Sequence, residues 1–224
     1  MNVSFRPLLA EFLGTALFVF IGAGSVVANA VTAGSIGSLG VALAHGVGIA
    51  VLISAFMSIS GAHFNPAVSV ALLVAGKIEG KTCGLYVVAQ LVGAVAGAAL
   101  VNALFAATAV AALSAGAPQL SLNTRFGQGV ALEAVFTFVL VSAVFGTAVS
   151  RDAPKIGGFG IGLAIFVAAL VAGGFTGAAL NPARAFGPAL VAGTWHSQAV
   201  YWIGPLVGGV VAGWIWRVLL LPKA

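Results

Sequence analysis

Long apolar stretches, separated by short polar segments, run through the whole chain. A helix that spans a membrane needs about 20 mostly apolar residues. Stretches of this kind lie at about residues 8–31, 37–59, 82–107, 127–150, 156–174 and 198–221. The pattern predicts an all-α membrane protein with six transmembrane helices. We expect the first helix to be retained, because its apolar run continues past Ala30 without a cleavage signal.

Two further apolar segments, at about residues 65–76 and 181–192, are too short to cross a bilayer. At 1.5 Å per residue, a helix of this length spans about 15 Å, roughly half of the ~30 Å hydrocarbon core. Ordinary surface loops are the alternative interpretation, but neither Val68–Ala75 nor Phe186–Ala192 contains a charged residue. We therefore expect two half-helices that enter the bilayer without crossing it.

Charged residues are scarce, since 6% of the chain is charged and 61% is hydrophobic. Soluble domains carry roughly 25% charged residues, so this chain lacks the polar surface of a soluble protein. Its formal net charge of +5 comes from scattered basic residues, which argues against nucleic acid as a partner. The 31 glycines fit a membrane bundle, because small residues let membrane helices pack closely.

The basic residues are unevenly divided between the two ends of the predicted spans. Arg125 and Arg184 fall on one side. Seven fall on the side shared by both termini: Arg6, Lys77, Lys81, Arg151, Lys155, Arg217 and Lys223. Basic residues concentrate on the cytoplasmic side of membrane proteins, so we expect both termini in the cytoplasm. The short termini and loops are typical of a bacterial protein, and the expected location is the bacterial inner (plasma) membrane.

The two halves of the chain resemble each other. Glu11 and Glu133 each begin a Glu-x-x-x-Thr pattern within an apolar span, and the tripeptide Asn-Pro-Ala follows once in each half. Three spans per half is an odd number, so the second half must be inverted relative to the first. Inverted repeats with short helices that meet at the midplane are a transport architecture. We expect one transmembrane channel domain, residues 1–224, with repeats at about 1–113 and 123–224.

The repeated motifs, Asn65-Pro66-Ala67 and Asn181-Pro182-Ala183, have the chemistry of helix starts. Asn is a preferred N-cap and Pro is preferred at the first helical position. In an inverted repeat the two starts meet near the bilayer centre, where their positive dipole ends repel cations and protons. The Asn amides can donate hydrogen bonds to a passing molecule. The alternative interpretation is that both Asn are purely structural caps.

Arg184 directly follows the second motif, where Val68 follows the first. An arginine in so apolar a stretch is costly, and it is by default a functional hypothesis. The repeat places it just outside the midplane, toward the exterior, where we expect it to line the pore and exclude cations. An arginine that reaches back to the membrane interface is the competing interpretation.

These residues together resemble the aquaporin (major intrinsic protein) family, and the resemblance covers essentially the whole chain. It implies a homotetramer in the lipid bilayer, with one central pore per subunit and passive flow. It also implies that Glu11 and Glu133 hold backbone donors of the loops that carry the half-helices. His63, two residues before Asn65, is expected to brace its loop.

The family's outer constriction has four positions, which transfer by their offsets from the two motifs. They fall on His45, Ala169, Ala178 and Arg184. Water-selective members usually have Phe and His at the first two positions, so the two alanines here imply a wider constriction. A His on the second helix with small residues elsewhere is similar to plant tonoplast intrinsic proteins and ammonia-permeable animal members. Glycerol facilitators have Asp after the arginine, where this chain has Ala185.

The resulting hypothesis is a channel for water that also admits small neutral solutes such as ammonia and urea. The alternative is a facilitator for glycerol or for neutral metalloid hydroxides such as arsenite. A coupled secondary transporter would need a titratable relay, yet Glu11 and Glu133 are the only acidic residues within the predicted spans. A structural adhesion protein of the same fold is not supported by the short, uncharged outer loops.

An enzyme is not expected, because the sequence contains no phosphate-binding loop and no catalytic triad in a plausible pocket. Cys83 is the only cysteine, which excludes an intrachain disulfide and a cysteine metal cluster. We therefore expect no cofactor and no metal.

Overall fold

The computed structural model describes residues 4–154 and 156–222. Lys155 and Lys223, which contribute to the charge asymmetry noted above, lie outside the described residues. Within the described part, the long helices are α1 (Phe5–Val31), α2 (Gly37–Ser60), α4 (Gly80–Leu104), α6 (Phe126–Val144), α7 (Phe159–Thr176) and α9 (Val200–Ile215). All of them, with α6 and α9 extended by one further turn, are long and apolar enough to cross a membrane, so the prediction of six spans is confirmed.

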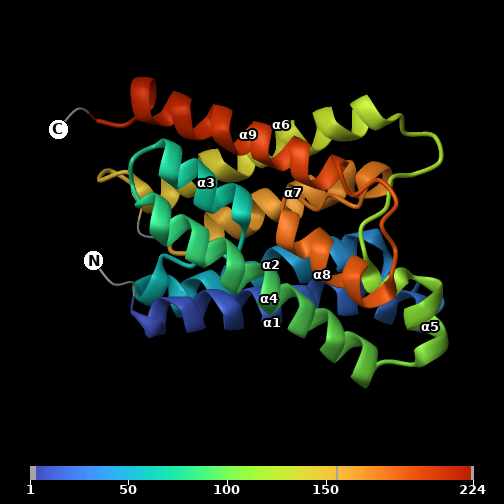
Figure 1. The fold of residues 1–224 in the computed structure, drawn as a ribbon. Coiled ribbons are helices and arrows are strands. Elements are labelled where there is room, and N and C mark those ends of the chain that lie inside the picture. Colours follow the sequence, from blue (N-terminus) through green and yellow to red (C-terminus); the bar gives the residue numbers. More distant parts are fainter. Residues whose placement is uncertain (1–3, 155, 223–224) are drawn as a thin grey trace.

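The two predicted half-helices are α3 (Pro66–Val74) and α8 (Pro182–Ala192). They enter the bundle from opposite ends, and their N-termini point toward its middle (Figure 1). α1 begins and α9 ends at the same end of the bundle, which we call the termini end. The short helix α5 (Ala107–Ala112) lies at the other end, the α5 end. The fold is thus the predicted inverted repeat.

Helix packing follows the repeat and ties the two halves together. α1 packs against α4 in the first half, and α6 packs against α9 in the second. Each half-helix instead packs mainly against the last span of the other half, α3 against α9 and α8 against α4. α2 also packs against α7 across the halves. Neither repeat can therefore separate from the other without exposing its half-helix.

Glycines make the closest helix crossings possible. A Cβ added at Gly97 of α4 would lie 2.2 Å from the carbonyl oxygen of Ala16 in α1. In the second half, a Cβ at Gly208 of α9 would lie 2.0 Å from the carbonyl oxygen of Ala134 in α6. Small residues at such crossings let the backbones approach, which is how membrane helices gain van der Waals contact.

Several details of the fold differ from the sequence prediction. The third span was expected to run to residue 107, but α4 ends at Leu104 and Phe105 is extended. α5 follows, and hydropathy does not reveal the break because the sequence stays apolar across it. α6 and α9 each end in a π-helical turn, η2 (Phe145–Val149) and η3 (Trp216–Leu220). The first residues of these turns stack on each other, with Phe145 and Trp216 ring centroids 5.7 Å apart.

The close crossing of α6 and α9 gives a test of this packing. Gly208→Val forces its side chain into the Ala134 carbonyl, and overpacking of this kind costs about 3 kcal/mol of unfolding free energy. SDS titration in mixed micelles measures the loss. Gly84→Val is the control, because a Cβ there meets nothing within 4 Å. Equal stability of the two variants would contradict a backbone contact at Gly208.

Candidate functional site

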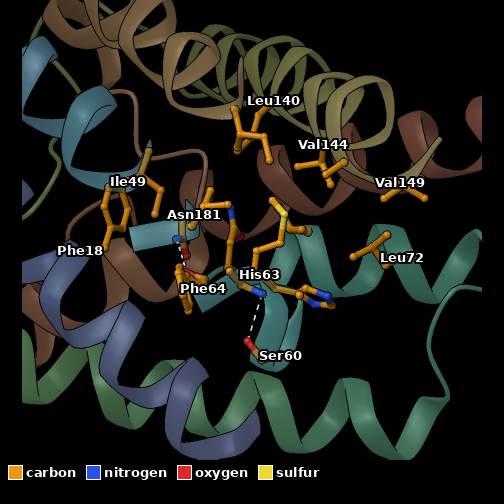
Figure 2. A pocket seen from close by; sticks show the side chains of 18 of the residues that line it. Phe18, Ile49, Ser60, His63, Phe64, Leu72, Leu140, Val144, Val149 and Asn181 are labelled. Atoms are coloured by element: carbon orange, nitrogen blue, oxygen red, sulfur yellow. Dashed lines mark hydrogen bonds between the residues drawn. The ribbon is translucent and has the colours of Figure 1, made fainter. Parts of the chain in front are cut away.

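The N-termini of α3 and α8 are joined by a reciprocal pair of hydrogen bonds. Nδ2 of Asn65 donates to the carbonyl of Leu180 at 2.8 Å, and Nδ2 of Asn181 donates to the carbonyl of Phe64 at 2.8 Å. Figure 2 shows the second of these bonds. Each half-helix is therefore held by the turn that precedes the other. The two helix starts meet in the middle of the bundle, as the sequence predicted.

Each Asn is also the N-cap of its own half-helix, with Pro66 or Pro182 at the first helical position. Oδ1 of Asn65 accepts from the backbone N–H of Ala67 at 2.8 Å, and Oδ1 of Asn181 accepts from that of Ala183 at 2.9 Å. The Nδ2 group of an Asn carries two N–H donors. One is used across the repeat, and the other has no partner among the described residues, so one N–H of each Asn can serve a molecule between the half-helices.

The turns that carry the motifs have the same unusual backbone in both halves. Ala62 and Ala178 have φ of 50° and 44°, and Phe64 and Leu180 have φ of 49° and 52°. A left-handed conformation costs a residue with a side chain roughly 1–2 kcal/mol. This conformation turns the Phe64 and Leu180 carbonyls toward the opposite Asn. The reciprocal hydrogen bonds therefore form only because the backbone is strained.

Glu11 of α1 is the acceptor that holds the first turn. Its Oε1 accepts from the Ser60 hydroxyl at 2.6 Å and from the His63 backbone N–H at 3.0 Å. Its Oε2 accepts from the Phe64 backbone N–H at 2.7 Å and from Nε2 of Gln90 at 2.8 Å. The carboxylate is fully buried. Non-helical backbone at this depth needs such partners, because there is no water in the bilayer core to satisfy it.

Glu133 of α6 holds the second turn in the same way. Oε1 accepts from the Thr176 hydroxyl at 2.6 Å and from the Ala179 backbone N–H at 3.0 Å. Oε2 accepts from the Leu180 backbone N–H at 2.7 Å. Every one of these donors has its counterpart at the matching position around Glu11. Both glutamates thus accept from backbone donors of the turns that carry the half-helices.

A second pair of matched contacts was missed by the sequence reasoning. Tyr86 of α4 donates its hydroxyl to the carbonyl of Ser60 at 3.0 Å, and Tyr201 of α9 donates to the carbonyl of Thr176 at 2.8 Å. The signal was present, because Ser60 and Thr176 both lie five residues before the motif Asn, and both are followed by Gly. Each tyrosine thereby fixes the end of the helix that leads into its turn.

We call Asn65 and Asn181 the Asn pair. A cavity of about 380 Å³ extends from it to the termini end of the bundle. Its walls are mostly aliphatic, and the polar side chains include Ser60, His63 and the two Asn (Figure 2). A second cavity of about 390 Å³ lies on the α5 side and is lined by His45, Ala169 and Arg184. We call them the termini-side cavity and the α5-side cavity.

Both cavities lie along the same face of α2. Val41 and His45 line the α5-side cavity, and Ile49, Ile53 and Met57 line the termini-side cavity. Residues spaced three to four apart share one face of a helix. α7 contributes in the same way with residues four apart: Ile161, Ile165, Ala169 and Gly173. The two cavities therefore follow one another along α2 and α7, and Asn65 and Asn181 line the termini-side one.

Arg184 and His45 face each other in the wall of the α5-side cavity. Nη2 of Arg184 lies 3.3 Å from Nε2 of His45, and Nη1 donates to the carbonyl of Gly116 at 3.0 Å. Nδ1 of His45 lies 2.9 Å from the carbonyl of Val41, which only accepts, so Nδ1 carries the proton. Nε2 is then an acceptor for the arginine. Nε of Arg184 is buried and has no partner among the described residues.

The other predicted residues fall as follows. Ala169 lines the α5-side cavity. Ala178 is 5% exposed and belongs to the apolar cluster beside it, while its neighbour Gly177 lines the cavity. The filter role of Ala178 stays a prediction, as does that of His45, Ala169 and Arg184. His63 lies 3.0 Å through Nδ1 from the Ser69 hydroxyl, a contact that braces the loop, and it also lines the termini-side cavity.

Comparison with known proteins decides the family. Residues 2–216 match the family model described as major intrinsic protein. The chain belongs to the major intrinsic protein family. Members of this family are channels and not enzymes. Aquaporin TIP4-4 of Zea mays is 43% identical over 97% of this chain and 88% of its own length. Aquaporin-2 of Rattus norvegicus is 40% identical over 98% of this chain and 80% of its own length.

A solved structure of the family has the same fold. The aquaglyceroporin from Plasmodium falciparum matches with a TM-score of 0.86, at 26% sequence identity, and the match covers 96% of each chain. The resemblance noted from the sequence is therefore confirmed at the level of family and fold.

The carboxylate that holds the second turn gives a testable consequence. Glu133→Leu leaves the Ala179 and Leu180 N–H groups without an acceptor, and each buried unpaired group costs about 1–3 kcal/mol. We expect the free energy of unfolding to fall by at least about 2 kcal/mol, measured by SDS titration. Glu79→Leu is the control, because Glu79 is exposed and makes no cap hydrogen bond. Wild-type stability of Glu133→Leu would mean that the turn has other acceptors.

Proposed function

We propose that this chain is a passive channel for water whose filter also admits small neutral solutes such as ammonia and urea. The observation that carries the proposal is the Asn pair, with one free N–H from each side chain on a path between two cavities. Two donors at one point orient a single water molecule by its oxygen. Its hydrogens then point outward on both sides, which interrupts a continuous chain of proton transfer.

Electrostatics support a neutral cargo. The N-termini of α3 and α8 face the same point, and each helix end is equivalent to about half a positive charge. Arg184 adds a full charge, and it is 2% exposed. A cation on this path meets the charge of Arg184 and the two helix ends at the midplane, whereas a neutral solute meets hydrogen-bond donors.

The width of the filter supports solutes larger than water. Ala169 lines the α5-side cavity opposite a pair of polar side chains, His45 and Arg184, that are hydrogen-bonded to each other. The Arg184 side chain is also tied to Gly116, so it is held at the wall. An alanine at position 169 leaves open the space that a larger side chain would occupy. We propose His45, Ala169, Ala178 and Arg184 as the residues of this filter.

A facilitator of glycerol or of neutral metalloid hydroxides is the second candidate. The similarity to an aquaglyceroporin structure and the aliphatic wall of the termini-side cavity favour it. Ala185 after Arg184, in place of an Asp, favours the water-channel reading. A coupled transporter is less well supported, because both buried glutamates are fully engaged in holding the two turns.

Assembly and orientation complete the proposal. We propose a homotetramer with both termini in the cytoplasm of a bacterial cell. The excess of basic residues on the termini side supports the orientation. In this orientation the His45–Arg184 filter faces the exterior, and the aliphatic cavity faces the cytoplasm.

Stopped-flow light scattering on proteoliposomes tests the function. We expect osmotic water permeability well above that of empty vesicles, together with faster urea and ammonia uptake. If water permeability equals that of empty vesicles while glycerol or arsenite uptake is rapid, the water-channel hypothesis is wrong and the facilitator hypothesis is correct. Uptake that stops when the proton gradient is removed would instead establish a coupled transporter.

The charge of Arg184 gives a separate prediction. A unit charge acting over 4 Å at an effective dielectric constant of about 20 is worth about 4 kcal/mol, so its loss lowers the barrier to cations substantially. Arg184→Val is expected to raise proton or sodium leak by about tenfold or more. A pH-sensitive dye inside the vesicles measures it. Arg125→Val, which removes an exposed arginine, is the control. Equal leak in both variants would remove Arg184 from the barrier.

A further inference from the structure

The imidazole of His45 is seated against a gap in helix α1. A Cβ built at Gly22 would lie 2.7 Å from Nε2 of His45 and 2.8 Å from Cδ2. The three heavy atoms nearest to that added Cβ all belong to this one ring. One turn earlier on α1, Phe18 meets the ring edge-on, with centroids 6.2 Å apart. The ring thus packs against Phe18 and fills the space on α1 that a side chain at Gly22 would occupy.

The backbone that carries His45 has no freedom to move away from α1. The next residue, Gly46, faces α7 so closely that an added Cβ would lie 2.8 Å from the carbonyl oxygen of Gly162. In return, a Cβ at Gly162 would lie 2.4 Å from the carbonyl oxygen of Gly46. Backbone against backbone cannot yield as a side chain does. A group added at position 22 therefore displaces the ring and not the helix.

We infer that Gly22 is a specificity-determining residue of the filter, although it is not one of the four filter positions. By lacking a side chain, it lets the imidazole of His45 withdraw against α1, which sets the open width beside Ala169. It also leaves Nε2 in reach of Nη2 of Arg184, so the arginine is held at the wall. The inference rests on the proposed function, because it concerns the width of the same filter.

The direction of the effect follows from the surroundings of the ring. His45 is 6% exposed and lines the α5-side cavity. Phe18, α1 and the pinned backbone of α2 block its other sides, so a displaced ring moves toward the cavity. A methyl group at position 22 narrows the filter and weakens the His45–Arg184 contact together. Permeability to larger solutes therefore falls more than permeability to water.

Gly22→Ala, reconstituted in proteoliposomes, tests this inference. We expect urea uptake to fall on the order of tenfold, the scale of one misplaced methyl group in a fitted site, with a smaller loss of water permeability. The measured quantity is the ratio of urea to water permeability, which misfolding alone would leave unchanged. Gly24→Ala is the matched control on the same helix, because its added Cβ would meet only yielding side chains of Phe105 and Val101.

A double-mutant cycle separates an effect through His45 from any other. In a His45→Ala background there is no ring to displace, so adding Gly22→Ala is expected to leave the permeability ratio unchanged. A fall of the ratio that persists in this background would overturn the inference, and so would an unchanged ratio in Gly22→Ala itself. Failure of the wild-type protein to conduct either water or urea would instead overturn the proposed function.

Discussion

Two buried carboxylates make the centre of this protein possible. The bilayer core offers no water to backbone groups, so an irregular turn at that depth must find every partner within the protein. Glu11 and Glu133 each supply both oxygens to one turn, and they satisfy two backbone N–H groups there and the side chain of a neighbouring hydroxyl residue. Without them Phe64 and Leu180, whose backbone is left-handed, would be both strained and unpaired.

Everything at the midplane follows from these turns. Once they are held, the Phe64 and Leu180 carbonyls point across the repeat, and Asn65 and Asn181 can bind them. That reciprocal bond fixes the separation of two helix N-termini that would otherwise repel each other through their dipoles. The packing of each half-helix on the opposite repeat adds to the same result. The N-termini of α3 and α8 stay close together because several independent contacts hold them there.

The sequence predicted the parts that rest on strong local rules. Length and apolar character were enough for the six spans, and Asn followed by Pro was enough for the two half-helix starts. Neither rule predicts contacts between residues that are far apart in the sequence and meet only in the folded bundle. Tyr86 and Gln90 lie on an apolar span; the matching positions of Ser60 and Thr176 mark the acceptors, but nothing near Tyr86 or Gln90 in the sequence shows that one meets the Ser60 carbonyl and the other Glu11. The break after Leu104 was hidden because the residues on both sides of it are apolar.

The repeat explains the architecture, and the residues that depart from it are those on which the proposed selectivity rests. Val68 and Arg184 occupy equivalent positions after their motifs, yet the first lines the aliphatic termini-side cavity and the second lines the α5-side cavity. The arginine is paired with His45 on the α5 side only, so the proposed function places discrimination at one end of the protein. Under the same proposal, the mostly aliphatic termini-side cavity offers few polar partners, so a molecule that has passed the filter leaves it without strong binding.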